Sequence, residues 1–471
     1  MVFSKAQCLV LLLLWNFTDA GRIVMKMKQR VRDVQLQRAK QHLLTAALQH
    51  VKEGRIHQQL DHFNRQDAKT FPQRFFVNEA FWQRPDGPVF LFIGGEGPVY
   101  EFDVLAGHHV DMAAEHGALL LAVEHRFYGE SINPDGLNTE NLYIVQSFSL
   151  SRRNIWISFG GSYSGALSAW FRGKFPHLVF GAVASSAPVK AELDFSAYSD
   201  AVGLSLMNEA VGGSEKCVSA VREAFGAAEA LMIRNVSQVA KDFRCCQTPK
   251  DHQDQVELMQ SLADIVMGTV QYNEESVLMS ISDLCGVMTN QSAAYEEERE
   301  PYQRLVKLSQ IYRSSSEEPC LDVSHEKTVK DLMDTTVQSE RRAERQWTYQ
   351  TCTESQTEIC LELFGISQNS LPGRVAFTNR YYGGDEPHTH RVLYVNGGVD
   401  PWKELSVGNR TDGGEEAESV FIRDSAHCAD MSRGRVTDRR SLKNARQEIE
   451  KHVQSWLKTA QQEKKRTEWR Y

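Results

Sequence analysis

Six short apolar runs constrain the fold of this 471-residue chain more than any other feature. Each run is bounded by turn residues and contains few polar positions, which is typical of strands that are buried on both faces. Such strands form a mostly parallel sheet that is covered by helices. The sequence therefore predicts an α/β fold whose strands are Pro88–Gly95, Ala118–His125, Asn154–Gly160, Val179–Ser185, Arg391–Gly397 and Glu418–Arg423.

A long helix-like block interrupts this series of strands. Between Lys190 and about Gln350 the apolar runs stop, and segments such as Asp254–Val270 have helical periodicity. We expect the block to form a helical, disulfide-containing cap inserted into the α/β domain, with Ser441–Gln461 as a final amphipathic helix on the sheet. The predicted parts are a signal peptide (1–20), an N-terminal arm or pro-segment (21–56), the α/β domain (57–189 and 351–471) and the cap (190–350). A solvated amphipathic helix is an equally good interpretation of residues 21–56.

The first twenty residues have the three parts of a signal peptide. Lys5 provides a positive charge, Cys8–Trp15 is an apolar run of eight, and Thr18–Ala20 ends on small residues. A buried strand is the alternative, but the order of the parts favours a signal. No other stretch approaches the ~20 apolar residues that a membrane span needs. We therefore expect a protein of the secretory pathway, located in endosomal or lysosomal vesicles or outside the cell, without membrane insertion.

Cysteines and glycosylation motifs agree with that route. No C-x-x-C pair occurs, so the eight cysteines that remain after signal removal favour disulfides over a metal site. The net charge of −8 gives no reason to expect a nucleic-acid partner. No cofactor or metal is indicated. The predicted N-glycosylation sites are Asn235, Asn290 and Asn409.

A candidate nucleophile follows the third apolar run. Trp156–Gly165 leads from a strand into a glycine-rich turn, and the helix former Ala166–Phe175 comes next. This is the context of a nucleophile elbow, in which a serine sits on a sharp turn above a sheet. Ser162 fits the serine of G-x-S-x-G, although Ser164 occupies the second glycine position and Gly165 comes one residue late. Ser164 is a weaker alternative nucleophile.

The order of the remaining polar residues supports a triad. Asp400 follows the fifth apolar run and His427 the sixth, which gives the order serine, acid, histidine found in α/β-hydrolases. The histidine takes the serine proton, and the acid orients the histidine. Asp424, Asp430 and His125 are competing candidates in less suitable turns.

Backbone N–H groups must then stabilise the developing oxyanion. We expect them from Tyr163, which follows the nucleophile, and from the glycine-rich loop after the first apolar run, at Gly95 and Glu96. A simple glycine turn is the alternative interpretation of that loop.

Several longer motifs resemble one family of serine peptidases, which includes lysosomal Pro-Xaa carboxypeptidase and lysosomal dipeptidyl peptidase. The resemblance runs from about residue 55 to 460. It rests on Gln59–Asn64, Phe92–Gly97, Glu124–Ser131, Gly160–Gly165, Phe175–His177, Ala184–Pro188, Arg345–Thr353, Tyr381–Gly384, Asn396–Trp402 and Ala426–Met431.

This resemblance implies an α/β-hydrolase with a helical cap and places the family's nucleophile, acid and base at Ser162, Asp400 and His427. It also implies exopeptidase action on short peptides, in several relatives after proline, and a part in endosomal peptide processing for T-cell selection. Peptides are the expected partners, and a homodimer is compatible with the family.

Two segments are shorter than the family pattern, Ile144–Arg153 before the nucleophile strand and Cys352–Cys360 near the expected substrate pocket. A catalytically impaired binding relative is therefore one alternative to an active peptidase. An esterase on the same fold is another.

Overall fold

The computed structural model describes residues 22–42, 50–60, 69–132, 154–273, 279–290, 300–336, 342–352, 357–408 and 418–468. The predicted signal peptide, the shortened segment at 144–153 and Asn409 lie outside these residues. No described helix is long and apolar enough to cross a membrane.

An eight-stranded sheet forms the centre of the molecule, in the order β1-β2-β4-β3-β5-β6-β7-β8. The six strands predicted from the apolar runs are all present and pair in parallel. The antiparallel pair β1 and β2 extends one edge; the more exposed β1 is rich in polar residues and gave no apolar run. The strands are β1 (Val51–Gln59), β2 (Thr70–Asn78), β3 (Val89–Ile93), β4 (Leu119–Val123), β5 (Trp156–Gly161), β6 (Gly181–Ser185), β7 (Val392–Gly397) and β8 (Glu418–Ile422).

Helices cover both faces of the sheet because successive strand side chains point to opposite sides. On one face Phe90 and Leu393 pack with residues of α4 (His108–His116) and α15 (Arg440–Glu468). On the other face Val392 packs against α5 (Tyr163–Lys174). Both helices predicted at the nucleophile and at the C-terminal end are therefore present.

The block between β6 and β7 is helical, and most of its buried side chains form one large cluster of their own. Its helices continue past Gln350, the predicted end of the cap, as far as Tyr382. They are α6 (Ala197–Met207), η3 (Glu209–Val211), α7 (Glu215–Asp242), α8 (His252–Gln271), α9 (Ile281–Met288), α10 (Pro301–Ser316), α11 (His325–Met333), α12 (Arg342–Gln350), α13 (Thr357–Phe364), η7 (Gln368–Ser370) and α14 (Leu371–Tyr382).

Three disulfides lie in this helical block, as the cysteine pattern predicted in general terms. They join Cys217 to Cys285, Cys246 to Cys320 and Cys352 to Cys360, while Cys245 and Cys428 are unpaired thiols. Of the two adjacent cysteines, Cys246 therefore forms a disulfide and Cys245 does not. Asn235 lies exposed at a kink inside α7, and Asn290 is exposed after α9. Both asparagines are accessible to a glycosylating enzyme, and their glycosylation stays a prediction.

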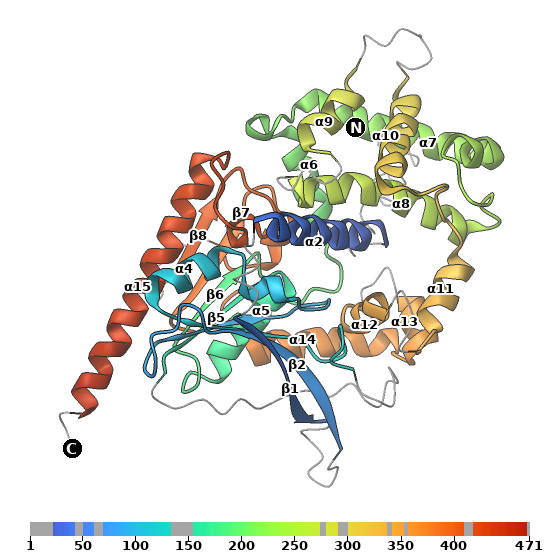
Figure 1. Ribbon diagram of the computed structural model, residues 1–471. Helices are drawn as coiled ribbons and strands as arrows, with labels where there is room; N and C mark the ends of the chain where they lie inside the picture. The colour runs from blue at the N-terminus through green and yellow to red at the C-terminus, as the bar shows by residue number, and fades with distance from the viewer. Residues whose placement is uncertain are drawn as a thin grey trace.

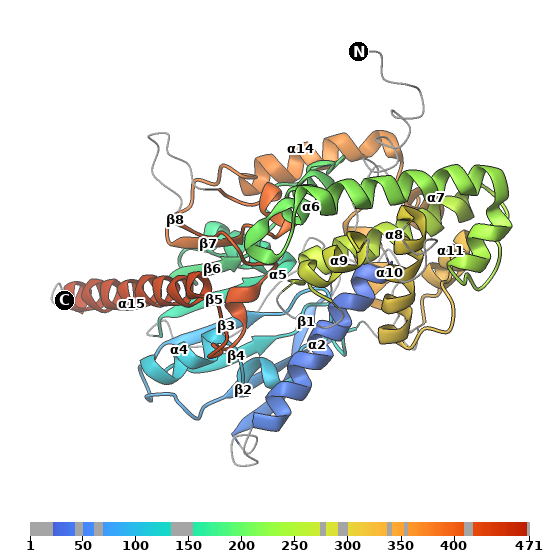
Figure 2. The same cartoon turned by 90° about the horizontal axis from the view of Figure 1, so that it is seen from above.

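The N-terminal segment contains helix α2 (Arg22–His42), which lies beside the helical block and over the sheet region (Figure 1). Ile23, Val24, Met27 and Val31 of α2 are buried, the first three of them in the core of the block. The view from above shows α2 extending from that block across the molecule (Figure 2). One face of α2 is therefore packed rather than solvated, and β1 begins at Val51, inside the predicted arm.

Candidate active site

Ser162 sits on a sharp turn between strand β5 and helix α5. Its backbone has φ 59° and ψ −131°, a conformation that residues with a side chain rarely adopt. The N–H of Ser162 donates to the carbonyl of Ser185 on the neighbouring strand β6, which holds the turn against the sheet. Backbone strain of this kind persists where surrounding contacts enforce it, as at a nucleophile elbow.

The glycines around Ser162 explain why the motif departs from G-x-S-x-G. A Cβ on Gly160 would lie 2.1 Å from the carbonyl oxygen of Ser164, and one on Gly165 would lie 2.7 Å from the carbonyl oxygen of Ser185. Position 164 has room for a side chain, and the Ser164 hydroxyl donates to the carbonyl of Gly161 at 2.8 Å. The second close approach therefore falls at Gly165, one residue later than the pattern expects.

Asp400 and His427 meet at the ends of β7 and β8. His427 Nδ1 lies 2.9 Å from Asp400 Oδ2, and the Asp400 side chain is fully buried. The other carboxylate oxygen of Asp400 accepts from the N–H of Trp402 at 3.0 Å. Burial by itself lowers the pKa of His427, but the charge of Asp400, the neighbouring Cys428 and hydrogen bonds to both side chains together outweigh it and raise that pKa well above 6.5. The pair is arranged to stabilise an imidazolium.

Helix α8 supports this pair through Gln271, a residue that the sequence analysis did not identify. The backbone N–H of His427 donates to the carbonyl of Gln271 at 3.1 Å. The side-chain oxygen of Gln271 accepts from Trp402 Nε1 at 3.0 Å and from the Tyr198 hydroxyl at 2.7 Å. The helical block therefore fixes the loops that carry Asp400 and His427. No local motif marks Gln271, because its partners are distant in sequence.

A buried network holds the turn after His427. Asp430 accepts a hydrogen bond from the Ser185 hydroxyl at 2.5 Å, and Arg446 of α15 donates to the carbonyl oxygens of Ala429 and Asp430. The N–H of Cys428 donates to the Ser186 hydroxyl at 2.9 Å. Burial raises the pKa of Asp430 to about 6.

The competing residues have other partners. Asp430 is bonded to Ser185, and Asp424 accepts from the hydroxyl of Ser441 at 2.5 Å. His125 lies 3.3 Å from the Tyr163 hydroxyl, and burial lowers its pKa to about 4.

A cavity of ≈ 1330 Å³ contains Ser162 and His427 in its wall, together with the loop from Gly94 to Gly97 that follows β3. Tyr163 is the first residue of α5, so its backbone N–H has no acceptor within the helix. The N–H groups of Gly95 and Glu96 belong to a loop of the same wall. Helix α2 forms much of the remaining wall.

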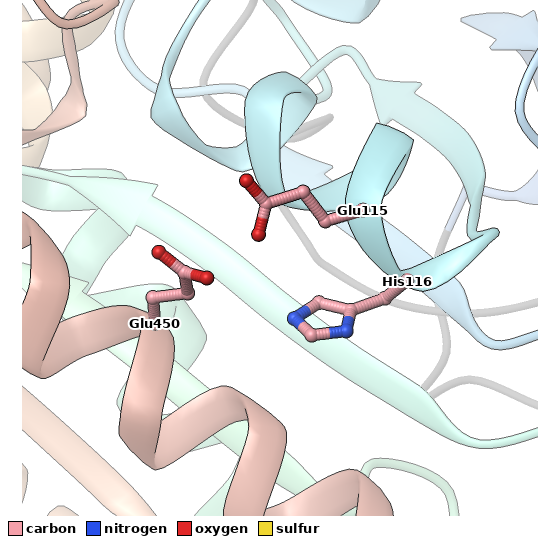
Figure 3. Close-up of side chains that lie close together, drawn as sticks. All are labelled: Glu115, His116 and Glu450. Atoms are coloured by element: carbon pink, nitrogen blue, oxygen red, sulfur yellow. The ribbon is translucent and has the colours of Figure 1, made fainter.

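A second group of polar side chains lies between α4 and α15, away from this cavity wall. Glu115, His116 and Glu450 bring possible ligand atoms within 4.8 Å of one another (Figure 3). A hydrogen bond between the two carboxyl groups, which raises the pKa of Glu450, already accounts for their closeness. Glu115 is exposed. We assign no ion to this cluster.

Comparison with known proteins decides the family. The model of the family described as Serine carboxypeptidase S28 matches residues 58–357 and 354–449. The chain belongs to this family. It is a serine-type peptidase, and its mostly parallel sheet covered by helices is an α/β-hydrolase fold.

Two relatives are similar in sequence to this chain over most of its length and of theirs. Thymus-specific serine protease of Homo sapiens is 39% identical over 453 residues, covering 87% of this chain and 88% of that protein. Lysosomal Pro-X carboxypeptidase of Mus musculus is 26% identical, covering 85% and 88%.

Among solved structures, a proline iminopeptidase of Mycobacterium smegmatis aligns over 86% of this chain and 98% of its own. The two are 11% identical, with a TM-score of 0.31.

Proposed function

We propose that this peptidase hydrolyses short peptides through an acyl-enzyme formed on Ser162. His427 removes the hydroxyl proton through Nε2, while Asp400 holds the other ring nitrogen and stabilises the imidazolium. One observation carries the proposal: the buried 2.9 Å contact between His427 and Asp400 lies beside a cavity that also contains a serine at positive φ.

The backbone complements this chemistry. Attack of Ser162 Oγ on the peptide carbonyl creates an oxyanion, which the N–H groups of Tyr163 and Gly95 are suited to stabilise. The N–H of Glu96, expected beside them, instead donates to the carboxylate of Glu96 itself. His427 then gives its proton to the leaving amine, and water hydrolyses the acyl-enzyme by the same route. Each donor belongs to a backbone segment that the sheet holds in place, so little reorganisation is needed during the reaction.

The substrates we propose are short peptides trimmed from one end, with proline next to the cleaved bond, in an endosomal or lysosomal compartment. The similarity to a lysosomal Pro-X carboxypeptidase supports this choice. Three disulfides in the described residues suit an oxidising lumen. Peptide supply for T-cell selection is the role that the family resemblance suggests. A panel of peptides differing only by Pro or Ala before the cleaved bond tests the preference through kcat/KM.

An active-site fluorophosphonate tests the nucleophile. We expect the wild-type protein to be labelled and Ser162→Ala to be unlabelled although folded. Ser164→Ala is the matched variant, because Ser164 lies two residues away on the same turn and bonds to Gly161. Labelling that survives Ser162→Ala and disappears in Ser164→Ala would refute the assignment. Absence of labelling in the wild type would favour an impaired binding relative.

A further inference from the structure

The side chain of Glu96 is a buried carboxylate next to the catalytic residues. It is 6% exposed, and the cavity wall that contains it also contains Ser162 and His427. Its electric field reaches the surrounding aromatic hydroxyls, since it raises the pKa values of Tyr163 and Tyr272 after burial has done so. A carboxylate in such a place costs several kcal/mol unless a cation accompanies it.

The accompanying cation comes from helix α2. Lys28 Nζ forms an ion pair with Glu96 Oε1, and the Lys28 side chain is 27% exposed. Burial raises the pKa of Glu96, but the charge and hydrogen bond of Lys28 outweigh it, so the pKa is lowered and the carboxylate stays ionised. The positive charge of His427 acts in the same direction to a smaller extent. An ionised Glu96 is therefore matched to a primary ammonium group.

Helix α2 is held over the cavity by contacts at several places. Met27 packs against α8, where a Cβ on Gly268 would lie 2.1 Å from its sulfur. Arg32 makes two hydrogen bonds of 3.0 Å to Asp103, in the 3-10 helix η1 (Glu101–Val104) after β3. Helix α2 thus bridges the helical block and the loops of the active site (Figure 2). In the sequence, Lys28 lies between the two anchoring residues Met27 and Arg32.

The ε-ammonium of lysine and the α-ammonium of a peptide are both primary ammonium ions with three hydrogen-bond donors. Glu96 also belongs to the loop that we expect to hold the oxyanion. An ammonium bound at Glu96 would therefore lie within a residue or two of the bond that Ser162 attacks. Such an arrangement suits removal of short fragments from the amino end of a peptide.

We propose that Glu96 is the anchor for the amino-terminal ammonium of the substrate and that Lys28 of α2 occupies this anchor as an internal competitor. This inference rests on the proposed function of Ser162. Displacement of the Lys28 side chain admits the substrate ammonium, and the charge on Glu96 remains balanced in both states. Glu96 is a specificity-determining residue, and α2 regulates access to it.

Matched peptides test this proposal: one with both ends free, one N-acetylated and one C-amidated. In the wild type we expect kcat/KM for free amino ends to exceed that for the acetylated peptide. Lys28→Met should raise kcat/KM for the free amino end roughly 10-fold and leave the acetylated peptide unchanged. Glu96→Gln should remove the discrimination between these two peptides. Arg30→Met is the control, because Arg30 lies on the same helix but outside the cavity wall, donates to the carbonyl of Ser315 and should change neither value.

The double variant Lys28→Met with Glu96→Gln leaves no unpaired buried charge, so it tests the anchor even where a single variant is unstable. It should hydrolyse free and acetylated peptides equally. Equal effects of Lys28→Met on both peptides, or discrimination that follows C-amidation instead, would overturn the proposal. Fluorophosphonate labelling distinguishes failure of the Glu96 anchor from failure of the Ser162 nucleophile. Labelling of Ser162 without any preference for free amino ends overturns the anchor alone. A wild-type protein that is not labelled overturns the nucleophile and the anchor together.

Discussion

Asp264 of helix α8 makes the stability of this protein depend on pH. Its carboxylate is 1% exposed and accepts from the backbone N–H of Ile23 at 3.1 Å and from the Gln260 side chain at 2.8 Å. Burial nevertheless raises its pKa from 3.8 to about 7. In the unfolded chain the group ionises near pH 4, so stability is fully present below that pH and is lost as the pH rises to about 7.

The size of this effect follows from the shift. About three pKa units at 1.36 kcal/mol each give an upper value of about 4 kcal/mol. Asp264→Asn removes the titration and weakens one of the two hydrogen bonds, at a cost of about 1 kcal/mol. We expect the variant to be more stable than the wild type at pH 7.5 by roughly 2–3 kcal/mol, and to equal it within about 1 kcal/mol at pH 4.5.

Urea unfolding followed by tryptophan fluorescence at the two pH values measures these differences. Asp283→Asn is a control of opposite sign, because hydrogen bonds from Ser280 lower the pKa of Asp283 in the capping box of α9. That variant should lose about the same stability at pH 7.5 and at pH 4.5, because both values lie above the unfolded pKa of 3.8, and the loss should shrink only as the pH falls below that value. The reasoning about Asp264 is refuted if Asp264→Asn changes the free energy of unfolding equally at both pH values. Higher stability in acid would suit the proposed endosomal or lysosomal setting.

Three further predictions concern the site and its support. Asp400→Asn should fold normally but lower kcat for peptide hydrolysis about 10⁴-fold, because the imidazole is then held in the wrong tautomer; a loss below 10-fold would remove Asp400 from the triad. Gly160→Ala places a Cβ 2.1 Å from an elbow carbonyl and should slow fluorophosphonate labelling roughly 100-fold, whereas Gly226→Ala, with open space around its Cβ, should not change the rate. Removing the disulfide between Cys217 and Cys285 by a double alanine substitution releases a loop whose ends are 68 residues apart, so denaturant unfolding should show a loss of up to about 4 kcal/mol; an unchanged midpoint would contradict this.

The sequence by itself determined the parallel strands and the order of the candidate triad. Strands buried on both faces need continuous apolar runs, and an elbow needs small residues around its serine, so both leave local signals. Strands β1 and β2 left a weaker signal, since β1 lies at the edge of the sheet with polar side chains in contact with water, and β2 beside it is only partly buried. Asp400 and His427 were identifiable because each follows a buried strand.

Only the tertiary structure decided which distant residues meet. Gln271 supports His427, Cys246 pairs with Cys320 while Cys245 stays free, and Lys28 reaches Glu96. The N-terminal segment shows the difference most clearly, because its composition fitted a solvated helix as well as an arm. Its partners are α8 and the loops after β3, which come together only when the sheet and the helical block are folded. Contacts of this kind depend on three-dimensional distance, and no local pattern of residue types records them.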